Sequence, residues 1–203
     1  MHENGADVNS TNKFGCNALL WSAQGKCTVD IMTWLFESGL DFNRINTNGH
    51  SALHKAAQRG NTVAVRWLVH SFLSESTTGR VFIHPDREGN CPSDLCGMEG
   101  HEDLAVWITA KECECISRLI RHAKSVEDLL VTYSSSILSW LVKDLHGVLA
   151  CKTNDISSVR TGWGPGNGVR RMSLAVMEQF VSKPTAQNLP RTIELGHELN
   201  DID

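Results

Sequence analysis

The sequence predicts an all-α solenoid in which short helix-turn-helix units stack one after another along the chain. Three observations predict it: a sequence pattern that recurs along residues 1–110, glycines at fixed places in each copy, and an apolar stripe at helical spacing late in each copy. One such unit cannot bury its apolar face alone. Stacked neighbours are therefore expected to share one continuous core.

Glycines mark the recurring hairpin turns most clearly. Gly15, Gly49 and Gly89 are separated by steps of 34 and 40 residues, and each lies where the chain must turn tightly. The pattern divides the repeat region into a partial unit at 1–9 and complete units at about 10–43, 44–80 and 84–110. The partial unit matches only the tail of a copy, so we expect the array to begin inside a repeat.

The second helix of each unit is predicted from a recurring aromatic position. Trp34, Trp67 and Trp107 share one register, each followed by an aliphatic residue, and Val63 and Val65 extend the stripe in the middle unit. We expect this stripe to be core. The first helices carry small residues at equivalent places, which lets neighbouring units approach closely; these are Ser22, Ala23, Ala56, Ala57, Cys96 and Gly97.

Two short motifs give the pattern a family resemblance. Ser51-Ala52-Leu53-His54 opens the middle unit, and Asn4-Gly5-Ala6-Asp7-Val8-Asn9 is echoed by Ser38-Gly39-Leu40-Asp41-Phe42-Asn43. Together they resemble the ankyrin repeat family, whose units combine a hairpin turn with two helices at a period near 33 residues. In the outer units Leu20 and Asp94 replace the motif His, and Ser93 replaces a core Leu, so the third unit fits the pattern least well.

The resemblance implies a protein that binds other proteins through a concave surface of hairpin tips and first helices. It also implies that His54 links neighbouring hairpins by hydrogen bonds to the backbone. The residues that the repeat leaves free for binding are Lys13, Phe14, Trp21, Gln24, Thr47, Asn48, His50, Lys55, Gln58, Arg59, Arg87, Glu88 and Met98. Phe14, Trp21 and Arg59 are the predicted energetic centre, since aromatic and Arg side chains dominate many interfaces. The alternative for Trp21 is packing on a neighbouring repeat.

Residues 111–150 are expected to form a helical cap or extension. Ser125-Val126-Glu127-Asp128 resembles a helix start, and apolar residues three or four apart continue to about Leu149. The resulting apolar face over 126–149 has two candidate uses, capping of the third repeat or pairing with another helix. Capping is favoured because exposed apolar stripes are uncommon on monomers.

Residues 151–203 are expected to form a low-order tail with a short helix at 173–181, because Ser, Thr, Asn, Gly and Pro dominate its composition. Its glycine-rich stretch at 162–168 is predicted to be a linker, since no Gly-Lys-Ser ending follows it. Arg170-Arg171-Met172-Ser173 resembles the substrate pattern of basophilic kinases, which makes Ser173 a candidate phosphosite. The alternative is a basic patch at the start of the short helix.

The composition of the chain argues against several classes of partner and site. A net charge of −4 argues against nucleic acid as a partner, and no apolar run is long enough for a membrane span. Seven cysteines at irregular spacing, without an export signal, indicate reduced thiols in the cytoplasm or nucleus. The only group with metal-ligand side chains lacks the paired spacing of zinc sites, so we expect no metal; its members are Cys91, Cys96, His101, Cys113 and Cys115.

No catalytic motif occurs in the sequence, so we predict that the protein is not an enzyme. We expect a monomeric adaptor that binds a protein partner and needs no cofactor. The alternative is a regulatory or targeting fragment of a larger multi-domain protein. An enzyme in the C-terminal half has the least support.

Overall fold

The computed structural model describes residues 5–25, 27–73, 84–122, 162–169, 171–172 and 174. Within these residues every regular element is helical, as the sequence predicted. The helices are α1 (Ala18–Gln24), α2 (Val29–Glu37), α3 (Ala52–Gln58), α4 (Thr62–Leu68), α6 (Pro92–Met98) and α7 (Glu102–His122), and α4 continues into a π-helical turn, η2 (Val69–Leu73).

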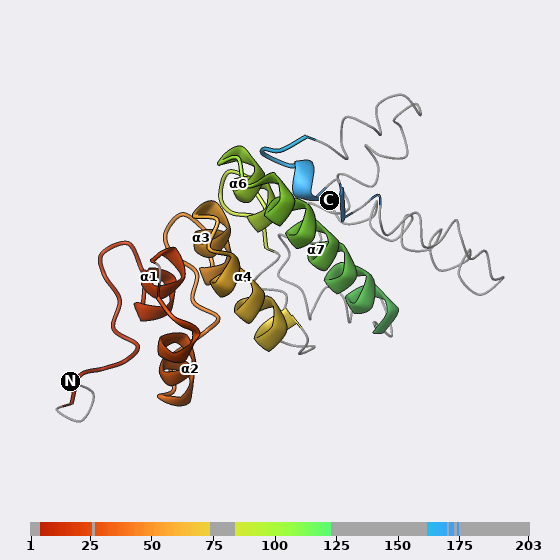
Figure 1. Ribbon diagram of the computed structural model, residues 1–203. Coiled ribbons are helices and arrows are strands. Elements are labelled where there is room, and N and C mark those ends of the chain that lie inside the picture. Colours follow the sequence, from red (N-terminus) through yellow and green to blue (C-terminus); the bar gives the residue numbers. More distant parts are fainter. Residues whose placement is uncertain are drawn as a thin grey trace, which may run out of the picture.

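The helices form two layers that follow the order of the chain (Figure 1). The first helices of the units, α1, α3 and α6, pack on one another in sequence, and the second helices, α2, α4 and α7, lie on the other side. Each pair, α1 with α2, α3 with α4 and α6 with α7, is one of the predicted units. The stack of helix pairs is therefore confirmed.

The hairpin tips are built by the same contacts in every unit. The side-chain oxygen of Asn46 accepts hydrogen bonds from the backbone N–H groups of Asn48 at 3.0 Å and His50 at 2.9 Å. Asn12 and Asp86 make the equivalent contacts in the other two units. Because this Asn or Asp lies three residues before each glycine, it is a further sequence signal for the tip, one that the spacing of the glycines does not include.

Neighbouring tips are joined through their backbones. The Thr47 N–H donates to the Phe14 carbonyl at 2.9 Å, and the Arg87 N–H donates to the Asn48 carbonyl at 3.1 Å. Gly49 has a φ of +84°, and a Cβ added to it would lie 2.9 Å from the Arg87 nitrogen. The close approach of one tip to the next and the left-handed backbone both require glycine there.

The core runs continuously through the three units. Leu19, Leu53 and Leu68 are fully buried, and the small residues Ala23 and Ala57 are buried where the first helices meet. Met32 of α2 and Ile108 of α7 continue the same cluster on the second helices. Because these residues are small, as the sequence predicted, α1, α3 and α6 come close enough to share this core.

Two residues of the predicted apolar stripe are not core. Trp34 is 50% exposed and Val63 is 57% exposed. Trp67 packs on Phe42 of the preceding unit, with ring centroids 5.8 Å apart, whereas Trp34 belongs to the first complete unit, before which the described residues form no helix pair. Val63 is the second residue of α4 and points outward, while Val65 on the same helix is fully buried.

The third unit has no break at residue 110. Helix α7 extends over 21 residues, from Glu102 to His122, and so joins the second helix of the unit to the start of the predicted extension. The apolar face expected at 126–149, with its choice between capping and pairing, lies outside the described residues. Of the short helix expected at 173–181, only residue 174 is described, and it is helical.

The glycine-rich stretch at 162–168, expected to be a linker, packs against α6 (Figure 1, blue). The chain turns at residues 164–167 and is helical at 167–169, 171–172 and 174. We refer to residues 162–174 as the docked segment. Its contacts could not be foreseen from composition, because they depend on side chains of α6 that are distant in the sequence.

In the ranges that the structure describes, no helix combines the length and the apolar character needed to cross a membrane. The longest, α7, begins with Glu102 and Asp103 and carries further charged residues along its length.

Candidate partner-binding surface

Apart from His50, the predicted binding residues lie exposed or partly buried at the hairpin tips and on or directly after α1, α3 and α6. We call the surface that they form the tip surface. Exposed on it are Lys13, Phe14, Trp21, Thr47, Asn48, Arg59, Arg87, Glu88 and Met98, while Gln24, Lys55 and Gln58 are partly buried. The repeat positions them in rows, because residues at equal places in successive units lie side by side.

The first unit carries the aromatic part of the tip surface. Phe14 at the hairpin tip is 54% exposed, and Trp21 on α1 is 55% exposed. The Lys13 ammonium lies 5.0 Å from the centre of the Phe14 ring, a cation–π distance. Trp21 therefore presents its ring to solvent, unlike the alternative in which it is buried against a neighbouring repeat.

The row that contains Trp21 changes character along the array. Lys55 of α3 occupies the equivalent place, and burial lowers the pKa of its ammonium, an effect that the nearby Cys16 partly opposes. Leu95 of α6, the next member of the row, is buried. Exposed apolar area in this row is thus concentrated in the first unit.

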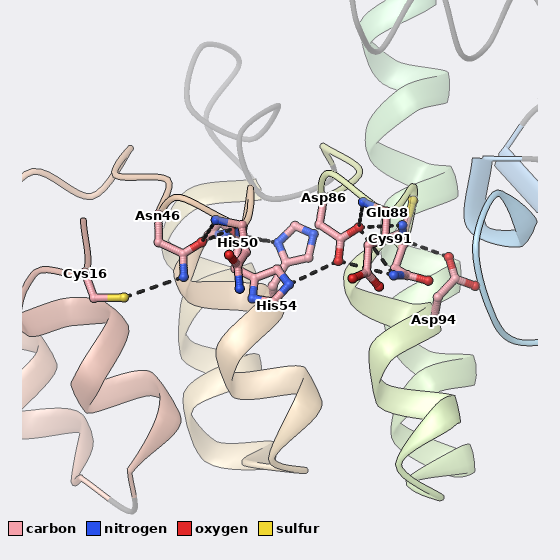
Figure 2. A network of polar contacts seen from close by, with 11 residues as sticks. Cys16, Asn46, His50, His54, Asp86, Glu88, Cys91 and Asp94 are labelled. Atoms are coloured by element: carbon pink, nitrogen blue, oxygen red, sulfur yellow. Dashed lines mark hydrogen bonds and ion pairs between the residues drawn. The ribbon is translucent and has the colours of Figure 1, made fainter. Parts of the chain in front are cut away.

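His50, one of the predicted binding residues, has a structural role instead. It is only 9% exposed, and its Nε2–H donates to the Asp86 carboxylate at 3.1 Å (Figure 2). Burial of Asp86 acts to raise its pKa, but hydrogen bonds from His50 and Asn90 outweigh this and lower the pKa to about 2. The pair joins the second hairpin tip to the third, which explains why His50 faces inward.

The rings of His54 and His50 are stacked, with their centroids 5.6 Å apart (Figure 2). His54 is fully buried, and its Nδ1 accepts a hydrogen bond from the Ser51 backbone N–H at 3.2 Å, which closes a capping box at the start of α3. Burial, followed by the neighbouring His50, lowers the pKa of His54 to about 3. A neutral imidazole that caps a helix is a structural group.

Two buried cysteines of the third unit, Cys91 and Cys96, are poor nucleophiles and poor metal ligands. Burial raises the pKa of the Cys96 thiol to about 12 and that of Cys91 well above its usual range. Metal ligation needs the thiolate, which both sites disfavour. Across the described ranges, no three His, Cys, Asp or Glu side chains are grouped so as to hold a metal ion.

A second polar cluster, which the sequence patterns did not reveal, lies at the end of the array. Ser93 and Asp94 of α6 and Glu112 of α7 are fully buried together with Arg171 of the docked segment. The only sequence signal was negative: Ser93 and Asp94 depart from the motif of the other units. Arg171 was expected in a kinase recognition pattern or a basic patch, yet it is buried. Ser173 itself lies outside the described residues, and its phosphorylation stays a prediction.

Comparison with known proteins agrees with the repeat geometry. A family model described as ankyrin repeats, in 3 copies, matches residues 1–77 and 28–118. Comparison with curated proteins gave no match. The matched region covers more than half of the chain and contains α1, α2, α3, α4, α6 and most of α7. The chain belongs to the ankyrin repeat family.

Proposed function

We propose that this protein is a non-catalytic adaptor that binds a protein partner through the tip surface. The observation that carries the proposal is the pair of exposed aromatic side chains, Phe14 and Trp21, on the first unit. Neither side chain is needed by the core. Exposed aromatic residues on a rigid scaffold are the usual energetic centres of protein interfaces.

The neighbouring polar residues support this choice of surface. Lys13 lies over the Phe14 ring, and the partly buried Lys55 of α3 and the exposed Arg59 directly after α3 add positive charge to the tip surface. A partner that offers an apolar anchor with acidic flanks would match this arrangement. We further propose that the chain is monomeric, works in the cytoplasm or nucleus and does not bind nucleic acid; the last point is supported by its net charge of −4.

The test is quantitative capture of partners on the intact chain. Proteins bound by the wild type are compared with those bound by Trp21→Ala and by Phe14→Ala. Trp34→Ala is the matched control, because Trp34 is exposed to a similar extent but lies on α2, in the other helix layer. We expect Trp21→Ala to weaken binding at least tenfold, which corresponds to about 1.4 kcal/mol, and Trp34→Ala to leave it unchanged.

The outcome separates the two faces of the array. If Trp34→Ala abolishes capture and Trp21→Ala does not, the partner binds the layer formed by α2, α4 and α7, and the proposal is wrong. If neither variant changes capture, the exposed aromatic residues do not bind the partner, and the proposal is also wrong.

A further inference from the structure

The docked segment resembles a hairpin tip in part. Asn167 N–H donates to the Gly164 carbonyl at 3.1 Å, Gly166 has a φ of +81°, and a helix begins at residue 167. Gly49 at the second hairpin tip likewise has a left-handed backbone, with a φ of +84°, but there the glycine itself donates the turn hydrogen bond, to the Asn46 carbonyl, and α3 begins three residues later at Ala52. The segment thus resembles the start of a fourth unit in having a glycine turn before a helix, but its turn differs in detail and its sequence lacks the repeat signature.

Its place in the stack is also that of a fourth unit. The Gly166 N–H donates to the Gly89 carbonyl of the third hairpin tip at 2.8 Å, as Arg87 donates to the second tip. The helical part then packs on α6, where the first helix of another repeat would lie (Figure 1). The docked segment therefore covers the end face of the third unit.

A buried ion pair anchors the segment. Arg171 Nη2 lies 2.7 Å from Asp94 Oδ1, and the two side chains are 4% and 0% exposed. The same nitrogen donates to Ser93 Oγ at 3.1 Å, and the other Asp94 oxygen accepts the Gly168 N–H at 3.0 Å. A buried guanidinium needs such partners, since an unpaired charge in the interior is strongly disfavoured.

Glu112 completes the anchor from α7. Its two oxygens accept hydrogen bonds from Ser93, one from the hydroxyl at 2.6 Å and one from the backbone N–H at 3.0 Å. Ser93 is thereby oriented so that its oxygen lone pairs are available to Arg171. The receptor half of the site, Ser93, Asp94 and Glu112, comes entirely from the third unit.

The docked segment also fits α6 closely in shape. Gly97 leaves room on α6 for the Trp163 ring, which would overlap with any added Cβ. Gly168 lies so close to α6 that a Cβ on it would be 2.5 Å from Asp94 Oδ2 and 2.6 Å from Cys91 Cβ. The Arg171 guanidinium lies over the Trp163 ring, 4.6 Å from its centre. Glycine is therefore required at residue 168, and the Trp163 ring fits a space that exists because residue 97 has no Cβ.

The departures of the third unit from the repeat motif fit this ligand. In the second unit the equivalent places hold Leu53 and His54, both fully buried. In the third unit they hold Ser93 and Asp94, polar groups whose burial would be costly without a partner. Arg171 is that partner. Ser93 and Asp94 thus offer Arg171 hydrogen-bond acceptors where the second unit has Leu53 and His54.

We propose that the end face of the third unit, formed by Ser93, Asp94, Gly97 and Glu112, is a peptide-binding site. Its ligand is a peptide with a tryptophan in a glycine-rich turn and an arginine eight residues later, and the chain's own docked segment occupies it. This site is separate from the tip surface and does not depend on the proposed adaptor function.

The test uses the full chain with its own ligand disabled. The variant carries Trp163→Ala and Arg171→Ala, which vacate the site and leave α6 and α7 unchanged. A fluorescein-labelled peptide of residues 162–174 is titrated into it and followed by fluorescence anisotropy. We expect saturable binding to the variant and at least tenfold weaker binding to the wild type, where the tethered segment competes at high effective concentration.

A labelled peptide with Arg171→Gln is the ligand control and should bind the vacated chain at least tenfold more weakly. Absence of binding by the unmodified peptide to a variant with native helical circular dichroism would overturn the proposal. Equal binding to the variant and the wild type would overturn it as well, because the peptide would then be using another surface.

A second measurement covers the case in which the vacated chain does not fold. Ser93→Leu with Asp94→His restores the repeat motif in the third unit and should release the docked segment. Backbone amides of residues 162–174 should then exchange with deuterium at least tenfold faster than in the wild type. Leu20→His, which restores the motif in the first unit, is the matched control and should not change that exchange. Unchanged protection in the third-unit variant would refute the site.

Discussion

Arg171 and Asp94 form an ion pair across 77 residues of sequence, with both side chains buried and 2.7 Å between Nη2 and Oδ1. Asp94 is also held by the backbone N–H groups of Cys91 and Gly168, each at 3.0 Å. The pair is thus part of a hydrogen-bonded anchor that joins the docked segment to the array.

Removing the arginine should destabilise the protein far more than removing a surface charge. Arg171→Ala leaves Asp94 buried without its cation, and losses of this kind are about 3–5 kcal/mol. The control is Lys111→Ala, because the exposed pair of Lys111 with Glu114 on α7 should contribute at most about 1 kcal/mol. Urea denaturation of both variants checks the difference, and a loss below about 1 kcal/mol for Arg171→Ala would show that the pair is not buried in solution.

Glu112 should make stability decrease as the pH rises toward neutrality. Burial, partly opposed by the Ser93 hydrogen bonds, raises the pKa of Glu112 from 4.5 to about 7. The folded state therefore holds a proton that the unfolded state releases between these values, so the free energy of unfolding should fall across this window by up to about 3 kcal/mol. Glu112→Gln should remove that fall. Urea midpoints from pH 4.5 to 8 measure it, and parallel pH profiles for variant and wild type would contradict the assignment.

His54 should have the opposite effect on the acid side. Its pKa is lowered from 6.5 to about 3, chiefly by burial. Between these pH values His54 is therefore protonated in the unfolded state and neutral in the folded state. Its contribution to stability is present above pH 6.5 and is lost as the pH falls toward 3. His54→Gln keeps a side chain able to complete the capping box with Ser51 and does not titrate. Acid denaturation followed by circular dichroism should show a shallower decline for this variant, and an identical decline would assign the acid sensitivity to other groups.

Gly97→Ala tests the docked segment through the sign of its effect. In a helix interior, replacing glycine by alanine ordinarily stabilises by about 0.5–1 kcal/mol. Here the new Cβ would overlap with the Trp163 ring, so we expect destabilisation. Trp163→Ala removes the obstacle, and Gly97→Ala added to that background should regain the ordinary stabilising effect. Thermal unfolding of the four chains measures this cycle. Stabilisation in the wild-type background would show that Trp163 does not pack on α6.

The repeats could be predicted because their signals are local and recur. Gly49, His54 and Leu68 each serve contacts within their own unit or with the next one, and the same residue types return at a nearly constant spacing. The exposure of Phe14 follows from the same regularity, since Asn48 and Glu88 at the equivalent tip positions are exposed as well. The exposure of Trp21 does not, since Leu95 at the equivalent position is buried.

The errors occurred where a residue's environment depends on a distant or missing neighbour. His50 was expected to be free, but Asp86, 36 residues away, holds it inward. Trp34 was expected to be core because Trp67 and Trp107 share its register, but it is 50% exposed, whereas Trp67 packs on Phe42, a contact that register alone does not reveal. Neither difference is visible in the local sequence pattern.

The sequence by itself determined the helical units and their order, because nearest-neighbour stacking makes position within a repeat equivalent to position in space. Only the tertiary structure decided how the third unit ends. In the sequence, Ser93 and Asp94 are only departures from the repeat motif, and residues 162–168 are predicted to be a linker. The role of each part becomes clear only when the two are seen in contact. The buried charge of Asp94 is tolerated because Arg171, which is distant in the sequence, pairs with it.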